Sequence, residues 1–370
     1  MQTIRRTLLF VLAFSFGTSL AAVGQTVIDT VPVGPAPRAL AVNKVTNKIY
    51  VSNWAGASVT VIDGATDSTT TVHVPEIDAH AIAVNSVTNR IFVADDAGSE
   101  ITVIDGATLA TTVVTVGGLP SAVAVNPVTN KIYVACLFGV VTVIDGATLA
   151  TTPLDIPGSL NAIAVDPVAN KIYVLNGAGS TMTVIDGVTL STEAVTVGPY
   201  PYALAVNPVT HKIYIAIDPM FGGNTVTVVD GVSLATTSVT VGQYPVDAAV
   251  NTITNKIYVA CEIGTVTVID GPTNETTSVT AGNEPFAVGV DTVTNKTYVV
   301  NSASNSVTMI DGQNLSTITI DVGNDPDAVA INPVTNRIYV PNYGDDTVSV
   351  IAGANVNPCA ICGRHAGSRN

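Results

Sequence analysis

The sequence predicts an all-β fold, a β-propeller of four-stranded blades over residues 26–351. Three observations lead to this prediction. A unit of 40 to 44 residues recurs along most of the chain, and each unit holds four short runs rich in Val, Ile, Thr and Tyr, which favour strands. No stretch keeps the 3.6-residue periodicity of an amphipathic helix. A repeat of about 40 residues with four strands is typical of a propeller blade.

The composition agrees with many buried strands joined by polar turns. Of the 370 residues, 47% are hydrophobic and 11% are charged, less than half of the roughly 25% usual in soluble domains. So large an apolar fraction excludes a disordered chain. The formal net charge is −14. Because an acidic surface repels phosphate backbones, we expect no nucleic-acid partner.

The N-terminus has the features of a secretory signal peptide, which we assign to residues 1–24. Arg5 and Arg6 precede a short apolar run over residues 8–16, and small residues follow around Ala21. The run is too short to span a bilayer comfortably and no second candidate follows, so we expect no transmembrane segment in the mature chain. An uncleaved anchor is the alternative. The mature protein is predicted to be secreted, periplasmic or on the cell surface.

The third unit shows the four strands of a blade in order. Its first strand is the Ala-Val-Ala-Val run before Asn126, closed by the turn Asn-Pro-Val-Thr-Asn. The Asn side chain can bond its own backbone two residues on, and Pro fixes the next φ. The second strand is Lys-Ile-Tyr-Val at 131–134, and the third is Val-Thr-Val-Ile-Asp ending at Asp145. The Asp-Gly that follows separates it from a Thr-rich fourth strand.

The turn and the third strand recur in every unit, and their number predicts eight blades. The turn begins at Asn43, Asn85, Asn126, Asp166, Asn207, Asn251, Asp291 and Asn332. The third strand ends at Asp63, Asp105, Asp145, Asp186, Asp230, Asp270, Asp311 and, in the last copy, Ala352.

The two ends of the repeat region predict a closed ring. Residues 26–33, Thr-Val-Ile-Asp-Thr-Val-Pro-Val, read as a fourth strand before the first full unit, whereas the last unit, 327–351, has only its first three strands. We expect the N-terminal strand to complete the last blade, which removes the open sheet edges.

At these residues the chain resembles the YVTN-type propeller repeat family of bacterial and archaeal envelope proteins. Tyr50-Val51-Ser52-Asn53 is nearest to the family's name, and the Val-Gly-x-x-Pro entry, the Asn-x-Val-Thr-Asn turn and the Val-Ile-Asp also fit. The resemblance implies a propeller fold and a place among surface-layer proteins and binding domains. Family members commonly have seven blades, so seven is the alternative to our count of eight.

A basic residue opens every second strand, and we interpret it as structural. These residues are Lys48, Arg90, Lys131, Lys171, Lys212, Lys256, Lys296 and Arg337. Hairpin symmetry places Lys131 directly across from Asp145, so we expect ion pairs between neighbouring strands, each contributing a few tenths to about 1 kcal/mol. A cationic ring for an anionic polymer is the other interpretation.

One position varies within an otherwise strict repeat, five residues before each turn. Its occupants are Arg38, His80, Ser121, Asn161, Tyr202, Val246, Phe286 and Asp327. It begins the innermost strand, at the mouth of the central channel, where mixed charged and aromatic groups suit a ligand site. We therefore predict ligand binding by Arg38, His80, Asn161, Tyr202, Phe286 and Asp327. Drift at an unused position is the alternative.

Acidic residues gather in loops at the same end of the predicted blades, among them Glu262, Glu284 and Asp325. Such a face could attract cations, amines or a basic partner. The unknown small-molecule or protein ligand is therefore expected to be cationic. Plain solubility is the competing explanation for the acids.

The cysteines and remaining acids suggest no cofactor. Cys136 and Cys261 occupy equivalent positions three blades apart, so we expect both to be buried and unpaired. Cys359 and Cys362 form a Cys-x-x-Cys in the tail, 352–370, and in an oxidising compartment a local disulfide is the default over a metal half-site or redox pair. Paired acids, such as Asp345-Asp346, give a weak Ca²⁺ signal because a site needs several converging oxygens.

These features predict a monomeric binding or scaffold protein of the cell envelope or exterior, with a ligand- or partner-binding face at the channel mouth. No catalytic motif is visible, and no catalytic residue is assigned. The alternative is a propeller enzyme, a lactonase or lyase that depends on a divalent cation at the same mouth. The fold hosts both classes of protein and cannot choose between them.

Overall fold

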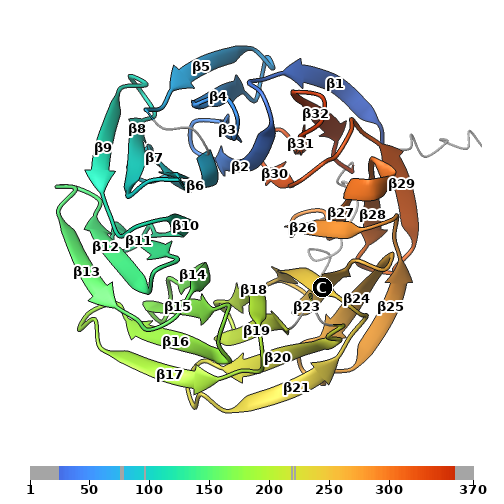
Figure 1. Cartoon of the computed structure of the whole chain (residues 1–370). Helices are drawn as coiled ribbons and strands as arrows, with labels where there is room; N and C mark the ends of the chain where they lie inside the picture. The colour runs from blue at the N-terminus through green and yellow to red at the C-terminus, as the bar shows by residue number, and fades with distance from the viewer. Residues whose placement is uncertain (1–24, 76–78, 96, 218–219, 221, 355–370) are drawn as a thin grey trace, which may run out of the picture.

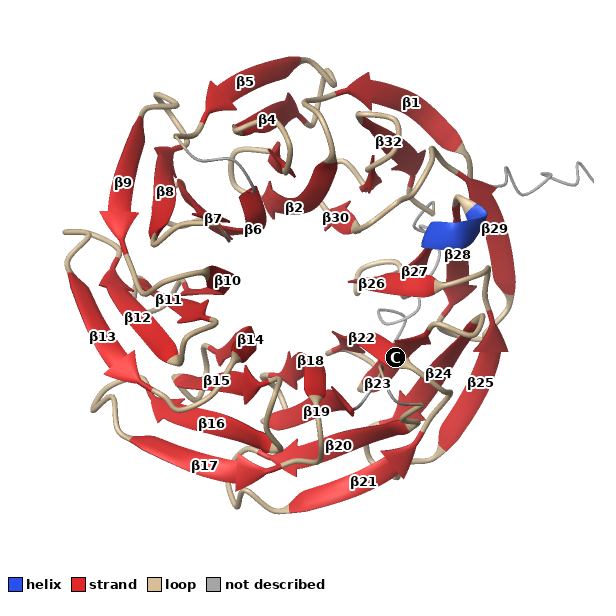
Figure 2. Cartoon of the chain, viewed as in Figure 1, coloured by secondary structure: helices blue, strands red, loops and turns tan. Residues whose placement is uncertain are grey.

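The computed structural model describes residues 25–75, 79–95, 97–217, 220 and 222–354. They form eight four-stranded antiparallel sheets arranged in a ring, an all-β, eight-bladed β-propeller (Figure 1). The prediction of eight blades is confirmed. Helix is confined to one short 3-10 turn, η1 (Ser302–Ser304), in this part of the chain (Figure 2).

Each blade runs from the ring axis outwards, and the blades are numbered 1 to 8 after their innermost strands. These are β2 (Pro37–Asn43), β6 (Ala79–Asn85), β10 (Pro120–Asn126), β14 (Leu160–Asp166), β18 (Pro201–Asn207), β22 (Pro245–Asn251), β26 (Pro285–Asp291) and β30 (Ala330–Asn332). The second strands are β3 (Lys48–Asn53), β7 (Arg90–Asp95), β11 (Lys131–Cys136), β15 (Lys171–Asn176), β19 (Lys212–Ile217), β23 (Lys256–Cys261), β27 (Lys296–Asn301) and β31 (Arg337–Asn342).

The third and outermost strands complete the blades. The third strands are β4 (Ser58–Asp63), β8 (Glu100–Asp105), β12 (Val140–Asp145), β16 (Thr181–Asp186), β20 (Thr225–Asp230), β24 (Thr265–Asp270), β28 (Ser306–Asp311) and β32 (Thr347–Ala352). The outermost are β5 (Thr69–His73), β9 (Thr111–Thr115), β13 (Thr151–Asp155), β17 (Thr192–Thr196), β21 (Thr236–Thr240), β25 (Thr276–Thr280), β29 (Thr317–Asp321) and, in blade 8, β1 (Val27–Pro32).

The hydrophobic core consists of layers between blades. Tyr133 and Val141 of blade 3, for example, pack with Ile172 and Val174 of blade 4. In seven blades the second strand is buried at every position after its basic residue, and in β15 only the last residue, Asn176, is partly exposed. This burial explains an apolar sequence without alternation. Fully burying a side chain of this size contributes about 1.5–3 kcal/mol. Burial also raises the pKa of Tyr133 to about 12.

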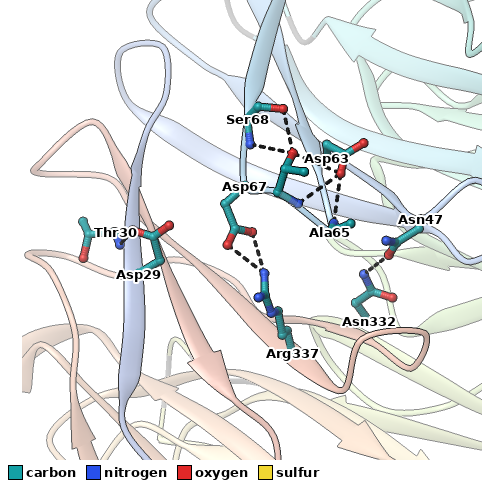
Figure 3. A network of polar contacts seen from close by, with 10 residues as sticks. Asp29, Thr30, Asn47, Asp63, Ala65, Asp67, Ser68, Asn332 and Arg337 are labelled. Carbon is teal, nitrogen blue, oxygen red and sulfur yellow. Dashed lines mark hydrogen bonds and ion pairs between the residues drawn. The ribbon is translucent and has the colours of Figure 1, made fainter.

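The ring closes as the sequence predicts, because β1 pairs with β32 of the last unit. Val31 faces Val348 across this pair. Blades 8 and 1 are also joined by side chains: Arg337 donates to both carboxylate oxygens of Asp67 at 2.7 and 2.9 Å (Figure 3). The strand from the start of the chain thus removes the edge that blade 8 would otherwise expose.

The recurrent basic residues lie where we expected them, but most do not form the expected ion pairs. Lys131 is in register with Asp145, yet its Nζ donates to the Gly187 carbonyl of the next blade at 2.9 Å. Asp145 instead accepts hydrogen bonds from the backbone and hydroxyl of Thr148 in its own turn, which lower its pKa. Because the Asp145 carboxylate accepts hydrogen bonds from its own turn, the Lys131 ammonium bonds to the neighbouring blade instead.

Direct pairs between these two positions form, among the described residues, in blades 1 and 7. Lys48 lies 3.9 Å from Asp63, and Lys296 lies 2.5 Å from Asp311. The same basic position in blades 2, 4, 5 and 6 donates to a glycine carbonyl of the next blade, as Lys131 does. The structural interpretation of the position stands, with a different partner for the cation.

The turns between first and second strands form what we call the turn rim. At six junctions the first Asn of one turn donates through Nδ2 to Oδ1 of the last Asn in the next blade's turn, at 2.7 to 2.9 Å. The pair Asn332 and Asn47 makes this link across the seam of blades 8 and 1 (Figure 3). The first Asn also accepts backbone amides of its own turn, as Val45 N to Asn43 shows at 3.0 Å.

Several predictions fall on residues outside the described ranges. They are the signal peptide, 1–24, and the Cys359–Cys362 disulfide in the tail. Cys136 and Cys261 are buried and free, as expected. Within the described ranges there is no helix long and apolar enough to span a membrane.

Candidate functional site

The variable position of the repeat is a β-bulge, which explains why its sequence is free to vary. In blade 5, Pro201 pairs with Ile217 and Ala203 pairs with Ala216, so Tyr202 has no residue opposite it. The same shift occurs in all of the first seven blades. A bulge changes the direction of a side chain, and that side chain does not have to pack against a cross-strand partner.

A second position on the same rim was missed by the sequence analysis. The residue just before the blade-opening proline has a left-handed backbone, with φ between 47° and 56°, in six blades. Its occupants are Ala36, Leu119, Tyr200, Tyr244, Glu284 and Asp325. Glycine is the usual residue for such a turn, and another residue costs about 1–2 kcal/mol. In the sequence this residue is the second variable position of Val-Gly-x-x-Pro.

We call the bulge and the turn before it, together with the loops between second and third strands, the entry rim. These segments lie at the same end of each blade because Pro120, which opens a first strand, pairs with Cys136, which ends a second strand. The inner strand between the two rims is only partly buried, so solvent reaches the axis of the ring. The entry rim is the predicted channel mouth.

Two predicted residues meet at the seam of blades 8 and 1. Arg38 Nε lies 3.6 Å from Asp327 Oδ2, and the Arg38 guanidinium carbon lies 5.8 Å from the centre of the Trp54 ring. Trp54 in turn faces Tyr343 with ring centres 6.2 Å apart. These side chains and Asp325 line a hollow of about 230 Å³. Burial raises the pKa of Asp327, against the opposing effect of Arg38.

Two further predicted residues meet between blades 4 and 5. Asn161 Nδ2 donates to the carbonyls of Pro201 and Tyr202 at 3.1 and 3.3 Å. A similar contact links blades 3 and 4, where Ser121 Oγ donates to the Leu160 carbonyl at 2.7 Å. Polar residues at the bulge therefore also tie one blade to the entry of the next.

Charged groups on three other blades act on the Tyr202 hydroxyl. Burial raises the pKa of its hydroxyl, Glu262 raises it further, Arg38 lowers it, and Asp247 and Asp327 raise it. These charged groups belong to blades 6, 1 and 8. Three predicted residues, Arg38, Tyr202 and Asp327, thus share one electrostatic environment.

Asp247 is another site residue that sequence reasoning missed. The position after the bulge is Ala in the other seven units, at residues 39, 81, 122, 162, 203, 287 and 328. Asp247 accepts the amides of Ala248 and, in the next blade, Val288, both at 2.8 Å. Burial nevertheless raises its pKa to about 6. The sequence did distinguish Asp247, since it is the one Asp at a position that is Ala in the other units.

The remaining predicted residues stand apart from these groups. Phe286 occupies the bulge of β26, two blades from Tyr202, and is half-buried. His80 lies in β6, but its side chain is outside the described part.

Ca²⁺ remains a prediction of the sequence. The carboxylates of Asp345 and Asp346 accept backbone amides from Asn324 and Ala36, at 2.6 and 2.8 Å. In the described part of the chain no group of three or more His, Cys, Asp or Glu side chains is placed to hold a metal ion.

Fold and rim together define a class, an eight-bladed propeller with one uniform rim and one variable rim. Kuenenia stuttgartiensis hydrazine synthase is similar with a TM-score of 0.61 and 17% identity, over 86% of this chain and 96% of that chain. The dihydro-heme d1 dehydrogenase NirN in complex with DHE is similar with a TM-score of 0.68 and 14% identity, over 88% and 76%. At these identities the likeness shows the fold alone. No protein-family model matches the sequence, and no curated protein matches it significantly.

Proposed function

We propose that this protein is a binding protein whose entry rim holds a ligand over the ring axis. One observation carries the proposal. Arg38, Tyr202 and Asp327 come from three blades, occupy the repeat's variable position, and lie within electrostatic reach of one another. Opposite charges beside an exposed aromatic ring at a concave mouth are the groups that orient a bound molecule.

The N-terminal sequence and the YVTN resemblance support a place for this binding protein outside the cytoplasm. Arg5, Arg6 and the apolar run after them have the pattern of a cleaved leader. We propose a secreted, periplasmic or cell-surface protein that works as a monomer. Detection of the mature N-terminus between residues 22 and 25 in the exported fraction would support this, and full-length protein with Met1 in the cytosol would contradict it.

The lactonase- or lyase-like alternative draws no specific support from the described residues. The carboxylates that face the mouth, Asp247 and Asp327, hydrogen-bond backbone amides or pair with Arg38. Binding is therefore the function that the geometry supports best, and the enzyme stays a prediction of the sequence.

The proposal is tested by a thermal-shift screen of small molecules, followed by titration calorimetry of the hits. The double variant Tyr202→Ala/Asp327→Ala should fold, because the bulge already accepts Ser121 and Val246 in other blades. Each lost contact is worth about 1 kcal/mol or more, so affinity should fall at least about tenfold.

A matched control lies on the turn rim, where Val128 and Val168 are exposed. The double variant Val128→Ala/Val168→Ala should bind hits as the wild type does. Hits that survive the entry-rim variant and are lost in the turn-rim variant would contradict the proposal.

A further inference from the structure

A cleft of about 340 Å³ opens on the entry rim where blades 4 and 5 meet. Its walls include Asn161, Tyr200, Pro201, Tyr202 and Met220. The two tyrosines remain 43% and 42% exposed, and Met220 remains 75% exposed. The volume suits a small molecule, and the walls offer it aromatic faces.

The two tyrosines are held in place by the backbone. Tyr200 has a left-handed backbone, with φ of 47°, directly before Pro201, whose ring fixes its own φ. Asn161 Nδ2 donates to the carbonyls of both Pro201 and Tyr202. The same left-handed turn precedes the opening proline in six blades, so the backbone of the repeat fixes where Tyr200 leaves the chain. The aromatic walls are therefore organised before any ligand arrives.

Acidic groups outnumber basic ones among the charges that act on Tyr202, which lines the cleft. Glu262, Asp247 and Asp327 all act on the Tyr202 hydroxyl, against the single cation Arg38. Burial, and then the nearby Glu284, raise the pKa of Glu262, as expected where carboxylates crowd together. None of the described residues that line the cleft is charged, so the acidic groups act from beyond its walls and no basic side chain among these residues stands in it. A cation at this point would gain from the field and from the ring faces.

The seam of blades 8 and 1 shows the same recognition chemistry with an internal cation. There the Arg38 guanidinium lies over the Trp54 ring at 5.8 Å and beside the Asp327 carboxylate at 3.6 Å. At the cleft of blades 4 and 5, aromatic rings and an excess of nearby acidic groups are present without a basic side chain among the described lining residues.

We infer that the cleft between blades 4 and 5 binds a small organic cation, an ammonium or guanidinium compound, with its charge over the ring of Tyr202. This inference rests on the proposed function, since Tyr202 belongs to both, and it adds the chemical class of the ligand. A neutral ligand such as a saccharide also stacks on tyrosine, so charge is the property to test.

The experiment is titration calorimetry of the full mature chain with choline, with agmatine, and with 3,3-dimethyl-1-butanol, the neutral isostere of choline. Choline or agmatine should bind at least about tenfold more tightly than the neutral alcohol, because only a cation gains from the field and the ring. Raising the salt from 50 to 500 mM should weaken the cation and leave the alcohol unchanged.

Variants locate the site. Tyr202→Leu should weaken the cation about five- to tenfold, and Tyr202→Phe should keep most of the affinity, since the ring face is retained. Phe138→Leu is the matched control, because Phe138 is 72% exposed on the same rim and does not line the cleft. It should bind as the wild type does.

Equal affinity for choline and its isostere, or full affinity in Tyr202→Leu, would overturn the inference. So would a wild type that binds neither cation. If a screened hit is nevertheless lost in Tyr202→Ala/Asp327→Ala, the proposed function stands without this ligand class. If the wild type binds no screened compound either, both proposals fail.

Discussion

The two rims of the ring use the ends of the same strands in opposite ways. On the turn rim, Asn207 at the end of β18 is fully buried and joins blade 5 to blade 6 through Asn255. On the entry rim, Tyr202 near the start of β18 lies at a bulge and is partly exposed. Where the fold needs a side chain, the repeat fixes it. Where a bulge releases it, the repeat allows a different side chain in each blade.

Two junctions of the turn rim depart from the Asn–Asn pair. Among the described residues, the Asp291 carboxylate of blade 7 bonds only within its own turn, whereas the junction of blades 4 and 5 keeps an equivalent link. Asp166 stands where most blades have Asn, and a carboxylate cannot donate the hydrogen bond to the next blade. The next turn carries His211 instead of Asn, and its Nδ1 lies 2.6 Å from Asp166 Oδ2. Both residues of the usual Asn–Asn pair are replaced, and the replacements still form a hydrogen bond between blades 4 and 5.

Closure supports both rims at once, and its removal should have the largest effect. Deleting residues 26–33 exposes the edge of β32 and uncovers Val31's partners Val348 and Val350. Each buried side chain of this kind contributes about 1.5–3 kcal/mol, so the free energy of unfolding should fall by on the order of 5 kcal/mol. Urea unfolding followed by circular dichroism measures it, and open-edge aggregation should accompany the loss.

The control is deletion of residues 355–370, which follow the last strand and should leave the unfolding midpoint unchanged. Equal midpoints for the wild type and the 26–33 deletion would show that the ring does not depend on its N-terminal strand.

The contrast within β18 is tested by one substitution at each end. Asn207→Ala leaves the partly buried Asn255 Oδ1 without its donor and removes the acceptor for Val209 N, so it should cost about 1–3 kcal/mol. Tyr202→Ala removes a bulge side chain with no cross-strand partner and should cost less than about 1 kcal/mol. Chemical unfolding of both variants gives the comparison. A larger loss for Tyr202→Ala would reverse the roles assigned to the two rims.

Asp247 sharpens the contrast, because here the entry rim retains a residue that opposes folding. Its folded pKa of about 6 lies above the ordinary value near 3.8, so the folded state favours the protonated acid. The resulting penalty is absent below about pH 4, grows between about pH 4 and 6, and is complete above it. Because Asp247 is only partly buried, the penalty should be about 1–2 kcal/mol.

The variant Asp247→Ala installs the residue of the other seven blades. At pH 7.5 it should be more stable than the wild type by that amount, and at pH 4 the two should be equal. Thermal unfolding across pH 4 to 7.5 measures the difference. A variant that is less stable at pH 7.5 would mean that the two backbone hydrogen bonds outweigh the burial of the charge.

The fold was predictable because each strand pattern recurs eight times along the chain. The copies of the turn, the orphan strand at 26–33 and the three-stranded last unit together gave the blade count and the closure. The cross-strand register of Lys131 and Asp145 also followed. The hydrogen bond from Lys131 to the Gly187 carbonyl could not be predicted. The sequence does not show that Asp145 already accepts hydrogen bonds from its own turn.

The site was predictable only in part. Variation within the repeat pointed to Arg38, Tyr202 and Asp327, but it could not say which variable residues meet across the ring. Asp247 was overlooked because its neighbours at the bulge vary more. Tyr200 was overlooked because a left-handed backbone before proline is not visible in the sequence when the residue is neither Gly nor Asn.

The smallest expected effect concerns the junction of blades 4 and 5 on the turn rim. If Asp166 and His211 only replace an Asn–Asn link, then Asp166→Asn/His211→Asn should restore the common pair and change the free energy of unfolding by less than about 0.5 kcal/mol. His211→Ala alone leaves the buried Asp166 carboxylate without that partner and should cost about 1–3 kcal/mol. Urea unfolding at pH 7 measures both. A double variant as unstable as His211→Ala would show that the Asp166–His211 hydrogen bond contributes something at this junction that an amide pair cannot. The links between turns would then be equivalent at six junctions rather than seven.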